Sequence, residues 1–189
     1  MQKRIIFILL MTIGIVTFSI SPLRGETPAS ATPSDCPSCA SLGVQRFQEK
    51  KEAPSFSLKD LDGNQITLSA LKGKPILMIF FASWCPGCKE EIPLFEKFSA
   101  GKRNPLTILT LAIDGEKEKK VQRFVKGLKI TLPVLLDVKE KVARTYGVKM
   151  VPTTFLIDGE GLMVGMIVGQ RDWSTPEAWS CVRELFSLR

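Results

Sequence analysis

The sequence predicts a single α/β domain, with a central mixed sheet flanked by helices and a β-hairpin at its N-terminal end. An unbroken apolar run at residues 75–81 is typical of a central strand that helices cover on both faces. From that run to the C-terminus, strand-like and helix-like segments alternate. The chain has 189 residues, 44% of them hydrophobic and 24% charged, which suits one buried core with an appendage.

The appendage is predicted to be an N-terminal export signal. Lys3 and Arg4 precede an apolar run at residues 5–20, a pattern typical of signal sequences. A helix of that length would span about 24 Å, less than the roughly 30 Å core of a bilayer, so a cleaved signal is slightly favoured over an anchor. We therefore expect residues 1–25 to be a signal peptide or signal anchor. The remainder is expected to be periplasmic or otherwise extracytoplasmic, either membrane-anchored by this segment or secreted after cleavage.

Residues 26–52 are expected to form a flexible linker that carries a Cys-Pro-Ser-Cys motif at residues 36–39. The first part of this segment, ETPASATPSD, is rich in Pro, Ala, Ser and Thr and can bury little apolar surface. The domain is then expected to occupy residues 53–189. It opens with two short strand-like runs around Asp62-Gly63, a dipeptide that favours a hairpin turn.

The remaining elements are predicted from the spacing of apolar residues, which differs between helices and strands. We predict strands at 75–81, 106–113 and 134–136, a helix that ends near 99, helices at 117–128 and 139–146, strands at 153–157 and 162–168 that pair as an antiparallel hairpin, and a last helix at 176–188.

Net charge gives no sign of a nucleic-acid partner. The formal charge is +7, but three of the 26 basic residues, Lys3, Arg4 and Arg24, precede the first acidic one. The others are mixed with acidic side chains, as in EKEKK at residues 116–120, which is typical of a solvated helix face. We therefore expect no nucleic-acid binding.

A second Cys-x-x-Cys motif, Cys85-Pro86-Gly87-Cys88, lies between the predicted central strand and the helix that follows it. In this position the first sulfur meets the N-terminus of the helix, where unpaired N–H groups and the dipole stabilise a thiolate. Cys85 is therefore the predicted nucleophile that attacks a partner's disulfide. Cys88, one turn later, is the predicted resolving thiol. This chemistry requires no cofactor.

Zinc binding is the alternative for such a motif, with Cys36 and Cys39 supplying two further ligands. The 45 residues between the two motifs are far more than a zinc ribbon uses, and the chain contains no histidine. The predicted strand and helix around Cys85 also favour redox chemistry. We therefore expect no metal site.

Several further motifs resemble one family. They are APSFSL at residues 53–58, DLDG at 60–63, LKGKP at 71–75 and FASWCPGCKEEIP at 81–93. In these motifs the chain resembles the thioredoxin superfamily, and within it the TlpA/ResA-like exported thiol-disulfide oxidoreductases, including those of cytochrome c maturation. The resemblance covers about residues 53–188. It implies a thioredoxin-like fold and a protein-disulfide reductase for exported proteins such as apocytochrome c, with a membrane electron donor of DsbD/CcdA type.

The resemblance also implies roles for residues around the two cysteines. Val151-Pro152 matches the superfamily's cis-proline loop, which packs beside the disulfide and offers backbone hydrogen bonds to a bound chain. Pro152 is therefore expected to be cis. Trp84, Pro86 and Gly87 are expected to contact the partner. Because Pro86-Gly87 departs from the pairs typical of this branch, the reduction potential and the direction of electron flow stay open.

Glu91 lies three residues after Cys88, where this branch carries a glutamate near its disulfide that is thought to handle protons. A carboxylate beside a thiolate and partly buried should have a raised pKa, which suits an acid/base role. Its neighbour Glu90 is the competing candidate. Ordinary thioredoxins carry a buried Asp where this chain has Ile79, which supports the assignment to this branch.

The Cys36-Pro37-Ser38-Cys39 motif lies outside the family pattern. Cys36 and Cys39 are interpreted either as a second redox pair that exchanges with Cys85 and Cys88, or as a local disulfide without a role. Cys181 shares one face of the last predicted helix with apolar side chains, and is expected to be a buried structural thiol.

Two other function classes are alternatives to this one. A peroxiredoxin-like peroxidase shares the Ala-Pro-x-Phe opening, but the three residues before Cys85 contain no threonine to contact peroxide. A copper-binding or copper-delivery module of SCO type would need a histidine, which the chain lacks. Both alternatives therefore rank below a thiol-disulfide oxidoreductase.

Overall fold

The computed structural model describes residues 36–100 and 105–188. The predicted signal at residues 1–25 and the first ten residues of the predicted linker lie outside this part of the chain. Within the described part, no helix combines the length and the hydropathy that a membrane span needs.

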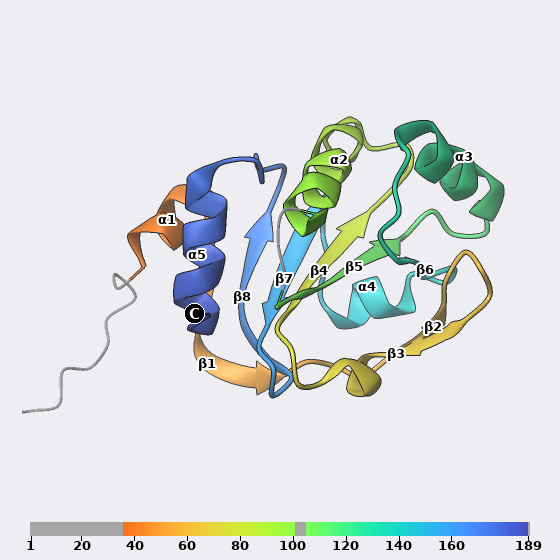
Figure 1. Ribbon diagram of the computed structural model, residues 1–189. Coiled ribbons are helices and arrows are strands. Elements are labelled where there is room, and N and C mark those ends of the chain that lie inside the picture. The colour runs from red at the N-terminus through yellow and green to blue at the C-terminus, as the bar shows by residue number, and fades with distance from the viewer. Residues whose placement is uncertain (1–35, 101–104, 189) are drawn as a thin grey trace, which may run out of the picture. The chain divides into compact units, whose positions relative to one another are not determined.

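A six-stranded mixed sheet forms the centre of the domain (Figure 1). Strands β4, β5 and β6 run parallel, while β7 is antiparallel to β4, and β8 is antiparallel to both β7 and β1. This arrangement confirms the predicted central mixed sheet. In spatial order the strands are β1 (Gln45–Glu52), β8 (Leu162–Val168), β7 (Thr153–Ile157), β4 (Ile76–Phe81), β5 (Thr107–Ala112) and β6 (Val134–Leu136).

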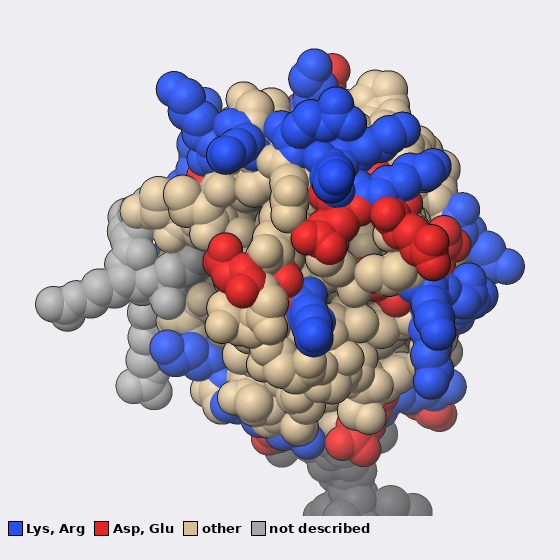
Figure 2. Space-filling view, turned by 90° about the vertical axis from the view of Figure 1, so that its right-hand side faces the viewer, with Lys and Arg blue, Asp and Glu red and all other residues tan. Residues whose placement is uncertain are grey.

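Helices cover both faces of this sheet. Their bounds are α1 (Pro37–Leu42), the 3-10 helix η1 (Leu68–Leu71), α2 (Pro86–Ala100), α3 (Glu118–Leu128), α4 (Lys141–Thr145) and α5 (Pro176–Phe186). Helix α3 is mostly solvated, with Val121 as its one fully buried residue. On the face that Figure 2 shows, basic side chains gather along the upper edge with acidic side chains directly beside them.

Alternate side chains of β4 enter two separate cores, because successive residues of a strand point to opposite faces of a sheet. Leu77, Ile79 and Phe81 pack with apolar side chains of α1, α2, α3 and α5. The intervening residues of β4 pack on the other face with side chains of α4, η1 and the hairpin strands. Every residue of β4 is buried, so β4 is the central strand that the apolar run predicts.

A β-hairpin is present but does not open the domain. Strands β2 (Ser57–Lys59) and β3 (Gln65–Thr67) pair antiparallel around the predicted Asp62-Gly63 turn. The Asp60 carboxylate accepts hydrogen bonds from the backbone N–H groups of Asp62 and Asn64, which closes the turn. Because α1 and β1 precede this hairpin, its predicted place at the N-terminal end of the domain is wrong.

The prediction of a flexible linker at residues 26–52 is wrong for residues 36–52. Residues 37–42 form α1, whose Cys39 and Leu42 are buried against the first core, and Gly43 ends the helix in a left-handed conformation. Residues 45–52 form β1, which pairs with β8. The folded body therefore begins before residue 53, because the apolar side chains of Cys36, Cys39 and Leu42 are buried on folding.

Candidate active site

The predicted reactive cysteines lie where β4 passes into α2. Cys85 and Cys88 are joined by a disulfide. The backbone N–H of Cys88 donates to Cys85 Sγ at 3.2 Å, and the Cys85 N–H donates to the carbonyl of Ala82 at 3.1 Å. Cys85 Sγ therefore meets the unpaired N–H groups and the positive dipole end of a fifteen-residue helix, which stabilise a thiolate once the disulfide is reduced.

The two cysteines differ in their access to solvent. Cys85 is 6% exposed and Cys88 is fully buried, whereas the preceding Trp84 is 64% exposed. An incoming disulfide can therefore reach Cys85 beside the exposed Trp84. Cys88 is accessible only to groups that lie inside the protein.

Asp114 holds the loop that carries the first cysteine. Both of its carboxylate oxygens accept a hydrogen bond from the backbone N–H of Ser83, at 2.9 and 3.1 Å, and one also accepts from the Ser83 hydroxyl. No sequence motif described above includes Asp114. It follows β5, the parallel neighbour of β4, and the carboxyl ends of parallel neighbours meet at one edge of a sheet, so its position was a usable signal.

The Val151-Pro152 loop packs against the disulfide. The Val151–Pro152 peptide bond is cis, as expected. The Val151 carbonyl oxygen lies 3.5 Å from Cys85 Sγ, and the Pro152 carbonyl accepts a hydrogen bond from Gly169 at 2.8 Å. Met150, just before this loop, is 56% exposed. The loop therefore presents backbone and apolar groups beside the sulfur that an incoming chain would meet.

Gly87 faces the same loop. A Cβ atom on Gly87 would lie 3.7 Å from Pro152 Cδ and 3.1 Å from Gln170 Oε1. Pro86 is exposed at the first position of α2, where its missing N–H leaves no intrahelical bond unmade. The structure thus brings together Trp84, the two cysteines and the cis-proline loop, as the resemblance implied.

Glu91 is buried one helical turn after Cys88, on the same face of α2. Its Oε1 accepts hydrogen bonds from Trp173 Nε1 at 2.7 Å and from the Arg171 backbone N–H at 3.3 Å. Burial raises the pKa of Glu91 to about 7, although both hydrogen bonds and the Arg171 charge act in the opposite direction. Oε2 is buried and has no hydrogen-bond partner among residues 36–100 and 105–188. The competing candidate, Glu90, is exposed and accepts a hydrogen bond from Gln170.

Trp173 is a second site residue, besides Asp114, that the sequence patterns do not indicate. It is 1% exposed and packs on Phe95 of α2 with ring centroids 4.1 Å apart. It lies 82 residues from Glu91 along the chain, in the loop between β8 and α5, and no local pattern connects the two. Its indole N–H fixes the orientation of the Glu91 carboxyl group.

The other three cysteines lie within the folded body of the protein, at α1 and α5. Cys36 and Cys39 form a disulfide at the start of α1, and both residues are almost completely buried. Cys181 of α5 is a free thiol with no exposed surface, which agrees with its predicted burial. Cys36 and Cys39 therefore belong to the folded body, and their exchange with Cys85 and Cys88 stays a prediction.

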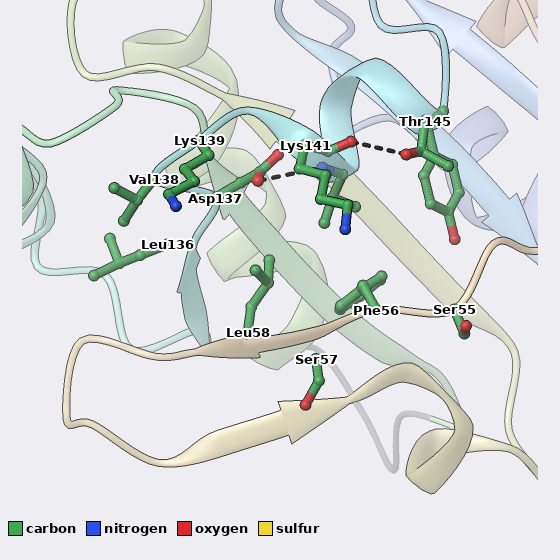
Figure 3. A pocket seen from close by; sticks show the side chains of 12 residues that line it. Ser55, Phe56, Ser57, Leu58, Leu136, Asp137, Val138, Lys139, Lys141 and Thr145 are labelled. Carbon is green, nitrogen blue, oxygen red and sulfur yellow. Dashed lines mark hydrogen bonds between the residues drawn. The ribbon is translucent and has the colours of Figure 1, made fainter.

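A cavity of about 320 Å³ lies away from the disulfide, between β2 and α4 (Figure 3). Phe56 and Leu58 from the hairpin side line it together with Val142 and Tyr146 of the α4 side. The Asp137 carboxylate at its edge accepts hydrogen bonds from two backbone N–H groups at the start of α4. Asp137 therefore caps the N-terminus of α4 at the edge of this cavity.

Comparison with known proteins places this site in a family. Residues 50–166 match the AhpC/TSA family, which is more than half of the chain. The chain belongs to the AhpC/TSA family. Within this family, the thiol-disulfide oxidoreductase ResA of Bacillus thuringiensis is 38% identical over 128 residues, covering 67% of this chain and 73% of that protein.

Two solved structures of similar proteins share the fold. StoA from Bacillus subtilis aligns with a TM-score of 0.59 at 27% identity, over 68% of this chain and 97% of that one. The pneumococcal exposed lipoprotein thioredoxin Etrx1 from Streptococcus pneumoniae aligns with a TM-score of 0.62 at 32% identity, over 69% and 99%. These findings confirm the thioredoxin-like fold and the resemblance to ResA-like proteins, and the chain is a thiol-disulfide oxidoreductase.

Proposed function

We propose that the protein reduces disulfides in exported partner proteins, with Cys85 as the attacking thiol and Cys88 as the resolving thiol. The observation that carries this proposal is the unequal access of the two sulfurs. Cys85 borders solvent beside the exposed Trp84, whereas Cys88 has no exposed surface. A partner's disulfide can thus reach Cys85 from solvent. Cys88 can be reached only by groups inside the protein.

Catalysis begins from the reduced pair. The Cys85 thiolate attacks one sulfur of the partner's disulfide, so that a Cys85–partner disulfide forms and the partner's second sulfur leaves as a thiolate. Cys88 then loses its proton and attacks Cys85 Sγ, which restores the Cys85–Cys88 disulfide and releases the partner as a dithiol. The described conformation, with the disulfide closed, is the product of this second step.

Glu91 supplies the proton acceptor for the second step. Its pKa of about 7 lets it change protonation state near neutral pH, and its position one turn after Cys88 places it on the same helix face. The unpartnered Oε2 is the oxygen free to take the proton. Glu90 is exposed and engaged with Gln170, which makes it the weaker candidate.

The partner chain binds across Trp84, Pro86, Gly87 and the cis-proline loop. Trp84 and Met150 are both more than half exposed, and each is next in sequence to a residue at the disulfide. Large exposed apolar side chains beside a reactive group are typical of protein-binding surfaces. The carbonyl oxygen of Val151 offers a backbone acceptor to a chain in the same place.

We propose an extracytoplasmic location, either membrane-anchored through residues 1–25 or secreted after cleavage of that segment. The basic-apolar pattern of these residues supports this, as does the similarity to Etrx1, an exposed lipoprotein thioredoxin. By resemblance, apocytochrome c is the candidate client and a membrane reductase of DsbD/CcdA type is the candidate electron donor. Sequencing the N-terminus of the protein from membrane and soluble fractions distinguishes the anchored from the cleaved form.

A trapping experiment tests the roles of the two cysteines. Cys88→Ser removes the resolving thiol, so this variant should accumulate a Cys85-linked adduct with a disulfide-containing client such as oxidised apocytochrome c. Cys85→Ser should form none, and Cys181→Ser should behave like the unchanged protein. An adduct through Cys88 in the Cys85→Ser variant, at a similar rate, contradicts the assignment.

The midpoint potential of the Cys85/Cys88 couple tests the direction of electron flow. A reductase should have a value near that of thioredoxin, about −270 mV, whereas an oxidant that inserts disulfides should lie near about −120 mV. Measuring the potential with Cys36 and Cys39 intact and replaced by Ser shows whether the two disulfides are coupled.

A further inference from the structure

Three sulfur atoms converge between α1 and α5, outside the site described above. Cys181 Sγ points its thiol at Cys39 Sγ across 2.9 Å, and Cys39 is already bonded to Cys36. All three sulfurs lie within 4.8 Å of one another, and all three residues are buried. A free thiol therefore faces a disulfide sulfur at contact distance inside the folded protein.

The contact between these sulfurs is held by packing on both sides. Helix α1 lies along α5 in Figure 1, and the two helices are in extensive contact. The Arg171 guanidinium donates a hydrogen bond of 2.8 Å to the carbonyl of Leu42, the last residue of α1. On α5, Cys181 is flanked by the fully buried Ala178 and Val182. The two helices thus keep the thiol aimed at the disulfide.

We propose that Cys181 is the internal exchange partner of the Cys36–Cys39 disulfide, so that the three cysteines form a second thiol-disulfide site with two alternative pairings. Cys181 Sγ loses its proton and attacks Cys39 Sγ. A Cys39–Cys181 bond forms, the Cys36–Cys39 bond breaks, and Cys36 leaves with the electron pair and takes up a proton. One disulfide and one thiol are present before and after, so no oxidant or reductant is consumed.

The surroundings of Cys181 determine the rate of this exchange. Burial raises the pKa of Cys181 to about 12, the Glu184 carboxylate of α5 adds to the rise, and the Arg46 guanidinium of β1 opposes it. The neighbouring groups on α1 are the bonded Cys36 and Cys39. Since only the thiolate attacks, exchange is slow at neutral pH and should accelerate about tenfold per pH unit while the thiol remains mostly protonated.

The two pairings differ in what they hold together. The Cys36–Cys39 bond joins residues three apart, within the first turn of α1. A Cys39–Cys181 bond would join residues 142 apart and fix α1 to α5 covalently. Exchange therefore decides whether the segment before β1 can separate from the C-terminal helix.

Disulfide mapping of the oxidised full chain tests this proposal. The chain is incubated without added oxidant or reductant at neutral and at alkaline pH, quenched in acid, alkylated under denaturing conditions and digested for mass spectrometry. We expect Cys36–Cys39 with alkylated Cys181, and in addition Cys39–Cys181 with alkylated Cys36. The rate of approach to the mixture should rise about tenfold per pH unit and should not depend on protein concentration. A single pairing that persists under both conditions, whichever residues it joins, overturns the proposal.

Variants separate this site from the active site. The Cys85→Ser/Cys88→Ser double variant should exchange at the same rate, and a loss of exchange there would show that Cys85 and Cys88 perform it. Cys181→Ser should retain only Cys36–Cys39. Cys36→Ser, treated with mild oxidant, should form Cys39–Cys181, so that α1 stays linked to α5 after proteolytic cleavage between α1 and β1. Failure to form that bond in the folded variant also overturns the proposal.

Discussion

Replacing Glu91 by Gln should remove most of the dependence of stability on pH between about pH 5 and about pH 8. Burial raises the pKa of Glu91 from 4.5 to about 7, so the folded chain binds the proton more tightly than the unfolded chain does. Stability is therefore greatest below the unfolded value and falls as pH rises through the folded value. At about 1.4 kcal/mol per pKa unit, the loss is about 3 kcal/mol.

Two features of the chain make this effect measurable. The chain contains no histidine, the side chain whose ordinary pKa lies in this range. Gln keeps the shape of Glu91 and can still accept the hydrogen bond from Trp173 Nε1. Glu91→Gln should thus be more stable than the unchanged protein at about pH 8, by up to about 3 kcal/mol, and similar to it at about pH 5.

Urea unfolding of the oxidised protein at a series of pH values measures the difference. For a slope of about 2 kcal/mol per molar urea, the midpoint of the unchanged protein should fall by about 1.5 M across the range, while that of Glu91→Gln stays nearly constant. The exposed neighbour provides the matched control, because Glu90→Gln should retain the full dependence. Equal slopes for Glu91→Gln and the unchanged protein would refute the assignment of this titration to Glu91.

Three further substitutions test the surroundings of the site and the sheet. Trp173→Phe removes the hydrogen bond that lowers the pKa of Glu91, so the midpoint of the stability change with pH should move to higher pH; an unchanged midpoint would contradict this role. A Cβ on Gly165 would lie 3.0 Å from a carbonyl oxygen of β1, so Gly165→Ala should lower the free energy of unfolding by about 1–3 kcal/mol. The control Gly127→Ala, where nothing lies within 4 Å of the added Cβ, should raise it by up to about 1 kcal/mol, and equal effects of the two would contradict the packing argument. Asp114→Ala removes the carboxylate that accepts the hydrogen bond of the Ser83 N–H in the loop before Cys85. It should lower the free energy of unfolding in urea by about 1–3 kcal/mol, whereas an unchanged value would show that the loop keeps its conformation without Asp114.

The sequence predicted those helices and strands whose residues have the composition or the apolar spacing typical of that type of element. Strand β4 is apolar throughout and β7 and β8 flank a recognisable turn, so all three were found. Strand β1 was missed because its sequence, QRFQEKKE, is charged and almost wholly exposed, and only the half-buried Phe47 indicates a strand. Backbone pairing with β8 decides its conformation, and pairing leaves no pattern in a charged edge strand.

The residues of the candidate site likewise divide into those that the sequence indicates and those that it does not. The two cysteines, the cis-proline loop and Glu91 belong to short motifs that can be recognised in one stretch of chain. Trp173 and the contact of Cys181 with Cys39 depend on residues 82 and 142 positions from their partners, and only the folded arrangement of α1, α2 and α5 brings these together.

Both edges of the six-stranded sheet carry features that disfavour the addition of a further strand. At one edge, β1 has a register shift between Arg46 and Lys51 and is lined with charged side chains. At the other edge, the short β6 is bridged by the hairpin, through Asp60 and Leu135. Both edges therefore disfavour pairing with an incoming polypeptide, so the contact expected under the proposed function is local to the cis-proline loop. Local contact of this kind favours rapid release of a bound polypeptide and limits co-aggregation with it.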